Sequence, residues 1–435
     1  MAASTLIKPE ELFAQQNAIT NWAGNLTYST TKIALPRTTS EVQELVKKFD
    51  RLKVLGTKHC FNTIADSNHQ LISLQQMNKV VTLDESAKTV TIEGGMSYGQ
   101  LCPFLQSSGY ALQNLASLPH ISVAGACTTA THGSGVNNGN LSTAVSGLEI
   151  VLASGDIINL SRKKDGEKFN GAVVGLGSLG VITKVTLDLV PAFLVRQDVF
   201  EHLPLEQLKK HFDEIVSGGY SVSLFTDWQR DTINEVWVKS RIDNDKKFQP
   251  SSLYFGAVAA KQNLHPIAEV SPENCTEQMG VPGPWFDRLP HFKMGFTPSS
   301  GKELQSEYFI HRKNAVDAIL AVSRLRKEIA PHLLTTEIRT IAPDKLWLSP
   351  CYEQPSVAIH FTWKQNIPEV NQLLTRIENV LELYQAKPHW GKLFNMAPPK
   401  LRALYPKMDD FIELTKTLDP AGKFRNEFLN KNIFA

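Results

Sequence analysis

Cysteine is scarce and scattered in this chain of 435 residues. The five cysteines form no CxxC pair, and their odd number and wide spacing predict neither a disulfide framework nor a zinc site. The dispersed histidines also lack the spacing of metal ligands, so we predict no metal. Reduced thiols are typical of cytosolic proteins, and we therefore expect a cytoplasmic location.

Long apolar runs and a strong net charge are also missing. No run of about 18 apolar residues occurs, and residues 1–18 lack the apolar core of a signal peptide, so we expect no membrane span and no export. A net charge of +2 without basic runs argues against a nucleic-acid partner. The length predicts two domains, because one compact core seldom holds so many residues.

Up to Pro191, the sequence shows an α+β pattern. An amphipathic helix is predicted over 40–50, with Ser40 and Gln43 as its capping box. Polar turns between strand-like segments predict two hairpins, over 79–92 and 147–161. A doubly wound fold would have helices where these hairpins stand.

After Pro191 the pattern predicts a second α+β domain. Its expected helices cover 205–216, 312–329 and 367–383, and its expected strands cover 221–228, 235–240, 335–341 and 357–362. A turn-rich segment follows from His389 onward.

Gly175, Gly177 and Gly180 match the GxGxxG pattern of dinucleotide-binding folds. That fingerprint needs a strand before it and a helix after it. Here the strand-like segment 181–187 follows, so no helix N-terminus is available for a pyrophosphate. We interpret the glycines as a tight turn where the backbone passes close to a ligand.

Two other segments have the composition of ligand-binding loops. Residues 54–62 join a short strand to a glycine-bearing loop, and residues 117–135 are dense in Gly, Ser, Thr and Ala. Small residues let backbone N–H groups approach phosphate oxygens. Composition alone favours this interpretation no more than it favours ordinary turns.

The order of these motifs resembles the vanillyl-alcohol-oxidase-type flavoproteins. The sequence GTKHC at 56–60 is similar to their first FAD loop, and residues 117–132 are similar to their second. Together with three later motifs, the pattern looks like the alditol oxidases of that family, from Asn21 to Phe424. The later motifs are Glu337-Ile338-Arg339, His360-Phe361-Thr362 and His389-Trp390-Gly391-Lys392.

The resemblance implies an α+β fold in which a two-subdomain FAD-binding domain of the vanillyl-alcohol-oxidase/PCMH type is joined to an α+β substrate domain. We expect the FAD-binding domain at 1–191, the substrate domain at 192–390 and a C-terminal return to the FAD-binding domain at 391–435. The implied reaction is FAD-dependent oxidation of the terminal hydroxyl of a sugar alcohol, such as xylitol or sorbitol, to the aldose. Molecular oxygen would be reduced to H2O2.

The resemblance also implies a covalent flavin, with the imidazole of His59 bonded to the 8α methyl of the isoalloxazine ring. Some relatives form a second bond through a cysteine of the second loop, but Ser117-Leu118-Pro119 holds none there, so we expect one link. Lys58 departs from the small residue common in the first loop. The expected cofactor-binding residues are Val54, Leu55, Gly56, Thr57, Lys58, His59, Cys60, Ser117, Ser122, Gly125, Thr129, Ala130, Thr131, His132, Ile182 and His389.

Polar residues alternate along two of the predicted strands. Glu337 and Arg339 are two apart and therefore share one face, and His360 and Thr362 repeat the arrangement. An exposed sheet face is the ordinary interpretation of such pairs, but the apolar flanks indicate a polar pocket in a buried sheet. The resemblance assigns binding of polyol hydroxyls to Ser117, Glu337, Arg339, Thr362 and Lys392.

Lys392 is the expected catalytic base. A lysine serves as a base only if burial or neighbouring cations lower its pKa from about 10.4. Arg339 would stabilise the developing alkoxide and the charge of the reduced flavin, and His360 is an alternative base. We expect His389 to contact the flavin and Trp390 to serve packing.

Two other functions remain open at this point. One is a dehydrogenase of the aldonolactone type that passes electrons to an acceptor other than O2, and Ala116 is a candidate position for the control of O2 access. The other is a non-catalytic flavin-binding protein, which Glu337, Arg339 and Lys392 argue against. We expect a monomer whose partners are a small polyol and O2.

Overall fold

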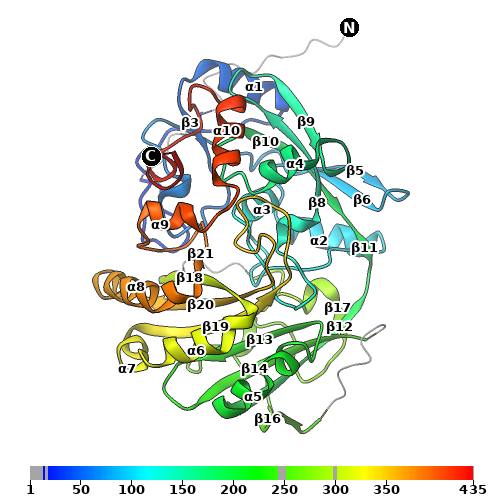
Figure 1. The fold of residues 1–435 in the computed structure, drawn as a ribbon. Helices are drawn as coiled ribbons and strands as arrows, with labels where there is room; N and C mark the ends of the chain where they lie inside the picture. The colour runs from blue at the N-terminus through cyan, green and yellow to red at the C-terminus, as the bar shows by residue number, and fades with distance from the viewer. Residues whose placement is uncertain (1–12, 15–17, 243–250, 297–300, 435) are drawn as a thin grey trace.

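The structure is a computed structural model that describes residues 13–14, 18–242, 251–296 and 301–434. Its N-terminal part and its C-terminal segment lie together above a large sheet, as Figure 1 shows. None of the helices in the described ranges is both long and apolar enough to cross a membrane.

Two small sheets form the N-terminal part. The first has the order β1 (Phe13–Ala14), β2 (Ile33–Ala34), β4 (Gln70–Ile72) and β3 (Leu52–Val54), and its last three strands run parallel. The second is antiparallel, with the order β5 (Val80–Asp84), β6 (Thr89–Glu93), β10 (Val181–Asp188), β8 (Val145–Val151) and β9 (Ile157–Ser161). The predicted hairpins are confirmed as the pairs β5–β6 and β8–β9.

Four helices pack around these sheets: α1 (Thr39–Lys48), α2 (Tyr98–Ser107), α3 (Val123–Thr128) and α4 (Arg162–Val173). The predicted helix over 40–50 is α1, but the predicted capping box is wrong. The helix begins one residue earlier, and the side chain of Thr38 accepts a hydrogen bond from the backbone N–H of Glu41. A short pair, β7 (Tyr110–Ala111) with β11 (Val190–Pro191), completes this part.

A ten-stranded sheet forms the second part of the molecule. Its order is β15 (Leu253–Tyr254), β16 (Ala257–Ala259), β12 (Leu194–Pro204), β14 (Thr232–Arg241), β13 (Ser221–Thr226), β19 (Leu333–Ile341), β20 (Ser356–Lys364), β18 (Glu303–His311) and β21 (Lys387–Pro388), with β17 (Gly283–Pro284) paired to β12. The four predicted strands are present as β13, β14, β19 and β20. The strands β12 and β18 were not predicted.

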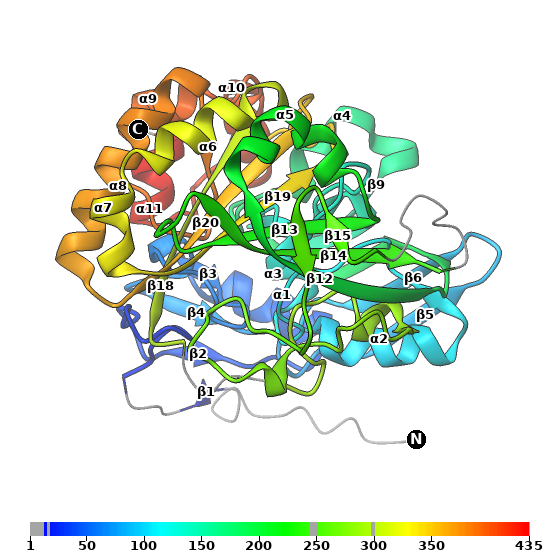
Figure 2. The ribbon, with the colours of Figure 1, turned by 90° about the horizontal axis from the view of Figure 1, so that it is seen from below.

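Helices cover one face of this sheet, and Figure 2 shows them grouped over its strands: α5 (Leu205–Val216), α6 (Ala315–Ser323), α7 (Arg326–Ile329) and α8 (Ile367–Leu381). The single helix predicted over 312–329 is wrong, because the chain divides it into a 3₁₀ turn, α6 and α7. Where α6 ends, the Ser323 hydroxyl donates to the carbonyl of Leu320 at 2.8 Å, a local bond that competes with helix continuation.

The period of two along the strands separates the two faces of the sheet. On β19, Ile338 belongs to the core under the helices, so Glu337 and Arg339 point to the opposite face. The same alternation on β20 places His360 and Thr362 on that opposite face. The helix-covered face is therefore apolar, and the face toward the N-terminal part carries the polar side chains.

The C-terminal segment returns to the N-terminal part. It holds α9 (Pro398–Ala403), α10 (Met408–Leu418) and α11 (Glu427–Leu429), and Figure 1 shows α10 beside α4. The backbone N–H of Leu52 donates to the carbonyl of Lys423 at 3.1 Å. Because the large sheet begins at Leu194 and ends at Pro388, we propose domain boundaries after residues 191 and 390.

Candidate active site

A cavity of about 770 Å³ lies between the N-terminal loops and the polar face of the large sheet. This size is within the usual range of ligand and cofactor sites. Every site residue expected from the sequence lines it except Ala130. Ala130 packs in the N-terminal core at 1% exposure and has a φ of 56°, so it shapes the second loop from behind.

One wall of the cavity is formed by the two N-terminal loops, and we call it the loop wall. His59 lies at its centre, with its ring centroid 4.4 Å from that of Trp22. The Nε2 atom of His120 is 3.3 Å from Nδ1 of His59. Burial first, and then His120 and Lys392, lower the pKa of His59 to about 3, so its imidazole is neutral.

The two loops approach each other closely because small residues face each other. A Cβ on Gly56 would lie 2.9 Å from Oγ of Ser122, and one on Gly125 would lie 2.6 Å from the same atom. The N–H of Ser122 donates to Oγ1 of Thr57 at 3.3 Å. Lys58 adopts a left-handed φ of 61°, so the unusual residue of the first loop stands where most side chains are strained.

The GxGxxG-like turn over 175–180 contributes to the same wall. It follows α4 and leads into β10, which confirms that no dinucleotide-type strand and helix flank it. The buried ammonium of Lys53 donates to the carbonyls of Leu176, Gly177 and Phe424 at 3.1, 3.0 and 3.3 Å. Burial lowers the pKa of Lys53 to about 7. One side chain thus fastens this turn and the C-terminal segment to β3.

The opposite wall, which we call the sheet wall, carries an ion pair. Arg339 donates through Nε and Nη2 to the two carboxylate oxygens of Glu337, and Nη2 also donates to the hydroxyl of Ser117. The Nε2 atom of His291 is 2.6 Å from Oε1 of Glu337. Burial opposes ionisation, but Arg339 and His291 hold the pKa of Glu337 well below its usual range.

A second polar cluster surrounds Lys392. Its ammonium is 2.8 Å from Oε2 of Glu307 and 2.7 Å from Nδ1 of His360. The other ring nitrogen of His360 is 3.1 Å from the hydroxyl of Thr362, and Oε1 of Glu307 is 3.1 Å from Nε2 of His132. Lys392, His360 and Thr362 thus form a continuous hydrogen-bonded chain along the cavity.

Burial changes the ionisation of this cluster. It lowers the pKa of Lys392, although Glu307 opposes the change. It also lowers the pKa of His360 to about 4, with Lys392 as the next cause. Burial alone would neutralise Glu307, but Lys392 and His132 hold its pKa well below the usual range. Burial thus shifts the pKa of Lys392 in the direction that a lysine base requires.

The C-terminal return brings His389 and Gly391 to the cavity. The N–H of Gly391 donates to Nδ1 of His389 at 3.0 Å, and the ring of His389 lies parallel to that of Phe309. A Cβ on Gly391 would lie 3.2 Å from Sγ of Cys60, so the return passes close to the first loop. Trp390 is fully buried, as expected for a packing residue.

The sequence alone did not identify Glu307 and His291 as residues of the site. Glu307 lies on β18, where polar residues at 303, 305 and 307 alternate with a mostly apolar set, and this period of two was a usable pattern. His291 was grouped with the dispersed histidines. It lies in an irregular segment, where no periodicity shows which way a side chain points.

The loop wall fits a flavin by its own chemistry. Its surface is built from closely packed small residues and backbone, and the lining of the cavity is mainly apolar. Nδ1 of His120 is buried and has no hydrogen-bond partner among the described residues. A neutral imidazole at His59 keeps a nitrogen lone pair, which bonding to a carbon atom requires.

Comparisons with known proteins agree with this fit. Residues 30–161 match the family described as FAD binding domain, and residues 297–432 match D-arabinono-1,4-lactone oxidase. An alditol oxidase of Streptomyces sp. is 45% identical over 95% of this chain and 98% of its own. An L-gulono-1,4-lactone dehydrogenase of Mycobacterium tuberculosis is 28% identical over 94% and 98% of the two chains.

Solved structures show the same architecture. The crystal structure of cholesterol oxidase from B. sterolicum superimposes with a TM-score of 0.77 and covers 99% of both chains at 14% identity. At that identity the match supports the fold alone.

The fold and the cavity together define a FAD-binding oxidoreductase. More narrowly, the chain belongs to the alditol oxidase branch of the vanillyl-alcohol-oxidase-type flavoproteins. The expected α+β flavoprotein fold and the expected family are thereby confirmed.

Proposed function

We propose that this protein oxidises the terminal hydroxyl of sugar alcohols, such as xylitol and sorbitol, to the aldose and reduces O2 to H2O2. The observation that carries the proposal is the sheet wall. It presents Glu337, Arg339, Thr362 and Lys392 to a cavity that Ser117 of the second loop also lines, in a chain 45% identical to an alditol oxidase.

The sheet wall favours a substrate with several hydroxyls. An ionised Glu337 accepts hydrogen bonds, Arg339 donates them, and the hydroxyls of Ser117 and Thr362 do both. A buried polar group left without a partner costs about 1–3 kcal/mol, so an apolar alcohol of similar size would bind less well. A polyol matches this set of donors and acceptors.

Lys392 is the base in our proposal. When bound, FAD supplies the hydride acceptor, its flavin N5 atom. The protein must remove the hydroxyl proton, and a neutral Lys392 accepts it while Glu307 holds the ammonium that results. Arg339 lines the same cavity and stabilises the developing alkoxide. His360 is the alternative base, since its Nδ1 atom is 2.7 Å from the lysine.

We further propose that His59 carries the flavin through one covalent bond to the 8α methyl group. The neutral ring at the centre of the loop wall supports this assignment. Cys127 is fully buried and is absent from the cavity lining, which supports a single link. Ser122, Gly125, Thr129 and Thr131 then face the remainder of the cofactor.

A flavin-dependent dehydrogenase of a sugar-derived lactone is the second candidate. The match of residues 297–432 to a lactone oxidase family and the 28% identity to a lactone dehydrogenase favour it. The two functions differ in how O2 reaches the flavin. Ala116 lines the cavity beside Ser117 and remains our candidate for that control.

A substrate panel with a peroxide assay tests the proposal. Purified holoenzyme is supplied with xylitol, sorbitol, L-gulono-1,4-lactone and a mono-alcohol under air, with and without a dye acceptor. We expect H2O2 in proportion to the xylitol or sorbitol consumed. Dye reduction without peroxide, or turnover of the lactone alone, would support the dehydrogenase instead.

Sedimentation of the same sample tests our expectation of a monomer, and cell fractionation tests that of a cytoplasmic location.

A further inference from the structure

A buried lysine lies beside the cavity, on the same face of the large sheet as the sheet wall, and the proposed reaction does not use it. Lys239 on β14 is 1% exposed. Its ammonium is 2.7 Å from the carbonyl of Leu289, 2.9 Å from that of Pro290 and 3.3 Å from Nδ1 of His291. An ammonium has three N–H donors, and these three acceptors match all of them.

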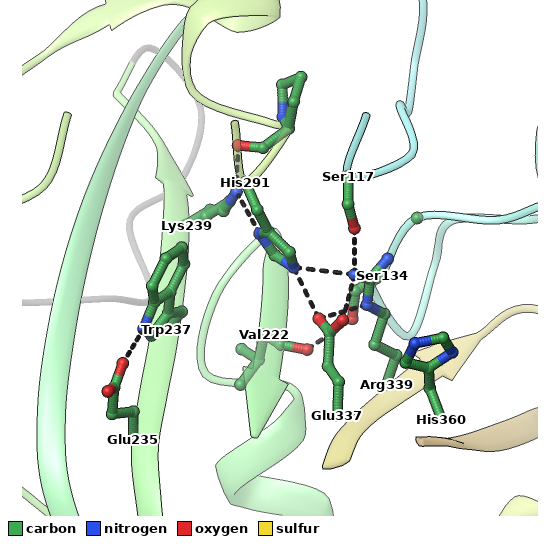
Figure 3. Close-up of polar contacts among 12 residues, drawn as sticks. Ser117, Ser134, Val222, Glu235, Trp237, Lys239, His291, Glu337, Arg339 and His360 are labelled. Atoms are coloured by element: carbon green, nitrogen blue, oxygen red, sulfur yellow. Dashed lines mark hydrogen bonds and ion pairs between the residues drawn. The ribbon is translucent and has the colours of Figure 1, made fainter. Parts of the chain in front are cut away.

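This arrangement decides where His291 carries its proton. Burial lowers the pKa of Lys239 well below its usual range, while Glu337 raises it, and the three acceptors around Nζ match its ammonium form. An ammonium donates to Nδ1 of His291, which makes that nitrogen the acceptor of the ring and assigns the N–H to Nε2. Nε2 is 2.6 Å from Oε1 of Glu337, as Figure 3 shows. His291 therefore donates a hydrogen bond to the carboxylate.

The contact between Arg339 and His291 does not require Nε2 to be an acceptor. Nη2 of Arg339 is 2.8 Å from Nε2 of His291. A guanidinium Nη2 has two hydrogens, and they are directed at Ser117 and at Oε2 of Glu337. No hydrogen is left for His291, so Nε2 need not accept one.

We propose that His291, oriented by Lys239, is a positioning residue that holds Glu337 as an ionised hydrogen-bond acceptor for a substrate hydroxyl. Oε1 already accepts from Arg339 and from His291, whereas Oε2 accepts from Arg339 alone among the residues that the structure describes. The second lone pair of Oε2 remains for a hydroxyl. The identity of that hydroxyl as part of a polyol rests on the proposed function, but the proton assignment does not.

The surroundings of Glu337 set the direction of its pH dependence. Arg339 lies on the same strand, His360 is the cross-strand partner of Glu337 on β20, and His291, Lys239 and Lys392 also interact with its carboxylate. Removal of the His291 donor raises the pKa of Glu337. A protonated Glu337 is a poorer acceptor, so the loss of substrate affinity on the acid side begins at a higher pH.

A trio of variants tests the positioning role in the holoenzyme. For His291→Leu we expect the KM for xylitol to rise roughly tenfold to a hundredfold, because a hydrogen bond to a charged group is lost. The acid limb of the KM profile should move to higher pH, while flavin reduction at saturating xylitol changes far less. His291→Gln keeps an N–H donor and should recover most of the affinity. The partly exposed His211→Leu, on α5 and outside the cavity lining, is the control. An unchanged KM and pH profile in His291→Leu would overturn the proposal.

Nitrogen NMR of ¹⁵N-histidine-labelled protein tests the proton assignment without substrate. The His291 signals are identified by their absence in His291→Gln. We expect a protonated Nε2 and an unprotonated Nδ1, and a change in this pattern in Lys239→Met. A ring protonated on Nδ1 would contradict the inference whatever the substrate is. The expected tautomer in a protein that does not oxidise polyols would refute only the proposed function.

Discussion

Both walls of the cavity carry buried titratable side chains, yet those of the loop wall are neutral histidines and those of the sheet wall include ionised carboxylates. On the loop wall, burial lowers the pKa of His59 and of His120, and no carboxylate opposes it. On the sheet wall, burial also acts on Glu307 and Glu337, but cations hold both carboxylates ionised. Burial removes charge only where no partner compensates for it.

This difference corresponds to two tasks. The neutral imidazoles of the loop wall suit the bonding of a flavin, whereas the ionised carboxylates of the sheet wall suit the binding of hydroxyls and the movement of a proton. Variants that remove one group from one wall should therefore affect one task and spare the other.

The largest effect is expected on the loop wall. His59→Ala should abolish covalent attachment completely, because the variant has no side-chain nitrogen at this position. Denaturation in acid followed by filtration separates free flavin from attached flavin. The exposed His69→Ala serves as the control and should retain it. Flavin that stays with the denatured His59→Ala protein would show that the bond is elsewhere.

Lys392→Ala removes the proposed base from the sheet wall. We expect anaerobic flavin reduction at saturating xylitol to slow by about 10²–10⁴-fold, the usual contribution of a general base. Covalent flavin should be unaffected. Stopped-flow absorbance measures the rate, with the exposed Lys400→Ala as the matched control. A nearly normal rate would transfer the role to His360.

Glu307→Gln tests the charge of the sheet wall, since it removes the negative charge of the side chain but keeps its shape. Glu307 raises the pKa of Lys392, and the active base is the neutral lysine. The rate of flavin reduction rises as pH increases through that pKa, so its acid limb should move to lower pH in the variant. We expect a reduction of about tenfold or more in the plateau rate, because Lys392 loses its charged partner. Stopped-flow measurements across a pH series would show the shift, and an unmoved limb would assign Glu307 a purely structural role.

The smallest effect should come from Thr362→Val, which replaces a hydroxyl by a methyl group of similar size. Loss of one neutral hydrogen bond of about 1 kcal/mol predicts a KM for xylitol raised by about fivefold. The rate of flavin reduction at saturation should change little. A steady-state comparison with the exposed Thr417→Val separates the two parameters. A large loss of rate with an unchanged KM would place Thr362 in the proton path instead.

Much of the sheet wall could be predicted because periodicity encodes it. Glu337, Arg339, His360 and Thr362 alternate with apolar residues, and the alternation alone places them on one face. Glu307 was missed because its strand was not identified. The loop wall needed the family resemblance, because a loop has no period that indicates which side chains meet.

The roles of Lys53, Lys239 and His291 could not be predicted from the sequence, for a different reason. The partners of the two lysines are backbone carbonyls, with one ring nitrogen beside Lys239, and any residue type can supply a carbonyl. His291 meets Glu337 and Lys239 from an irregular segment. A lysine at 1% or 2% exposure is also contrary to the usual behaviour of that residue. Only the folded structure shows that the ammonium groups of Lys53 and Lys239 have three acceptors each.

Anaerobic addition of xylitol to the yellow holoenzyme tests the central claim most directly, because it requires both walls to face the same substrate. The account predicts that the flavin absorbance bleaches completely with xylitol and returns on admission of air, with one H2O2 formed for each flavin. Absorbance that stays unchanged at saturating xylitol and sorbitol would contradict it.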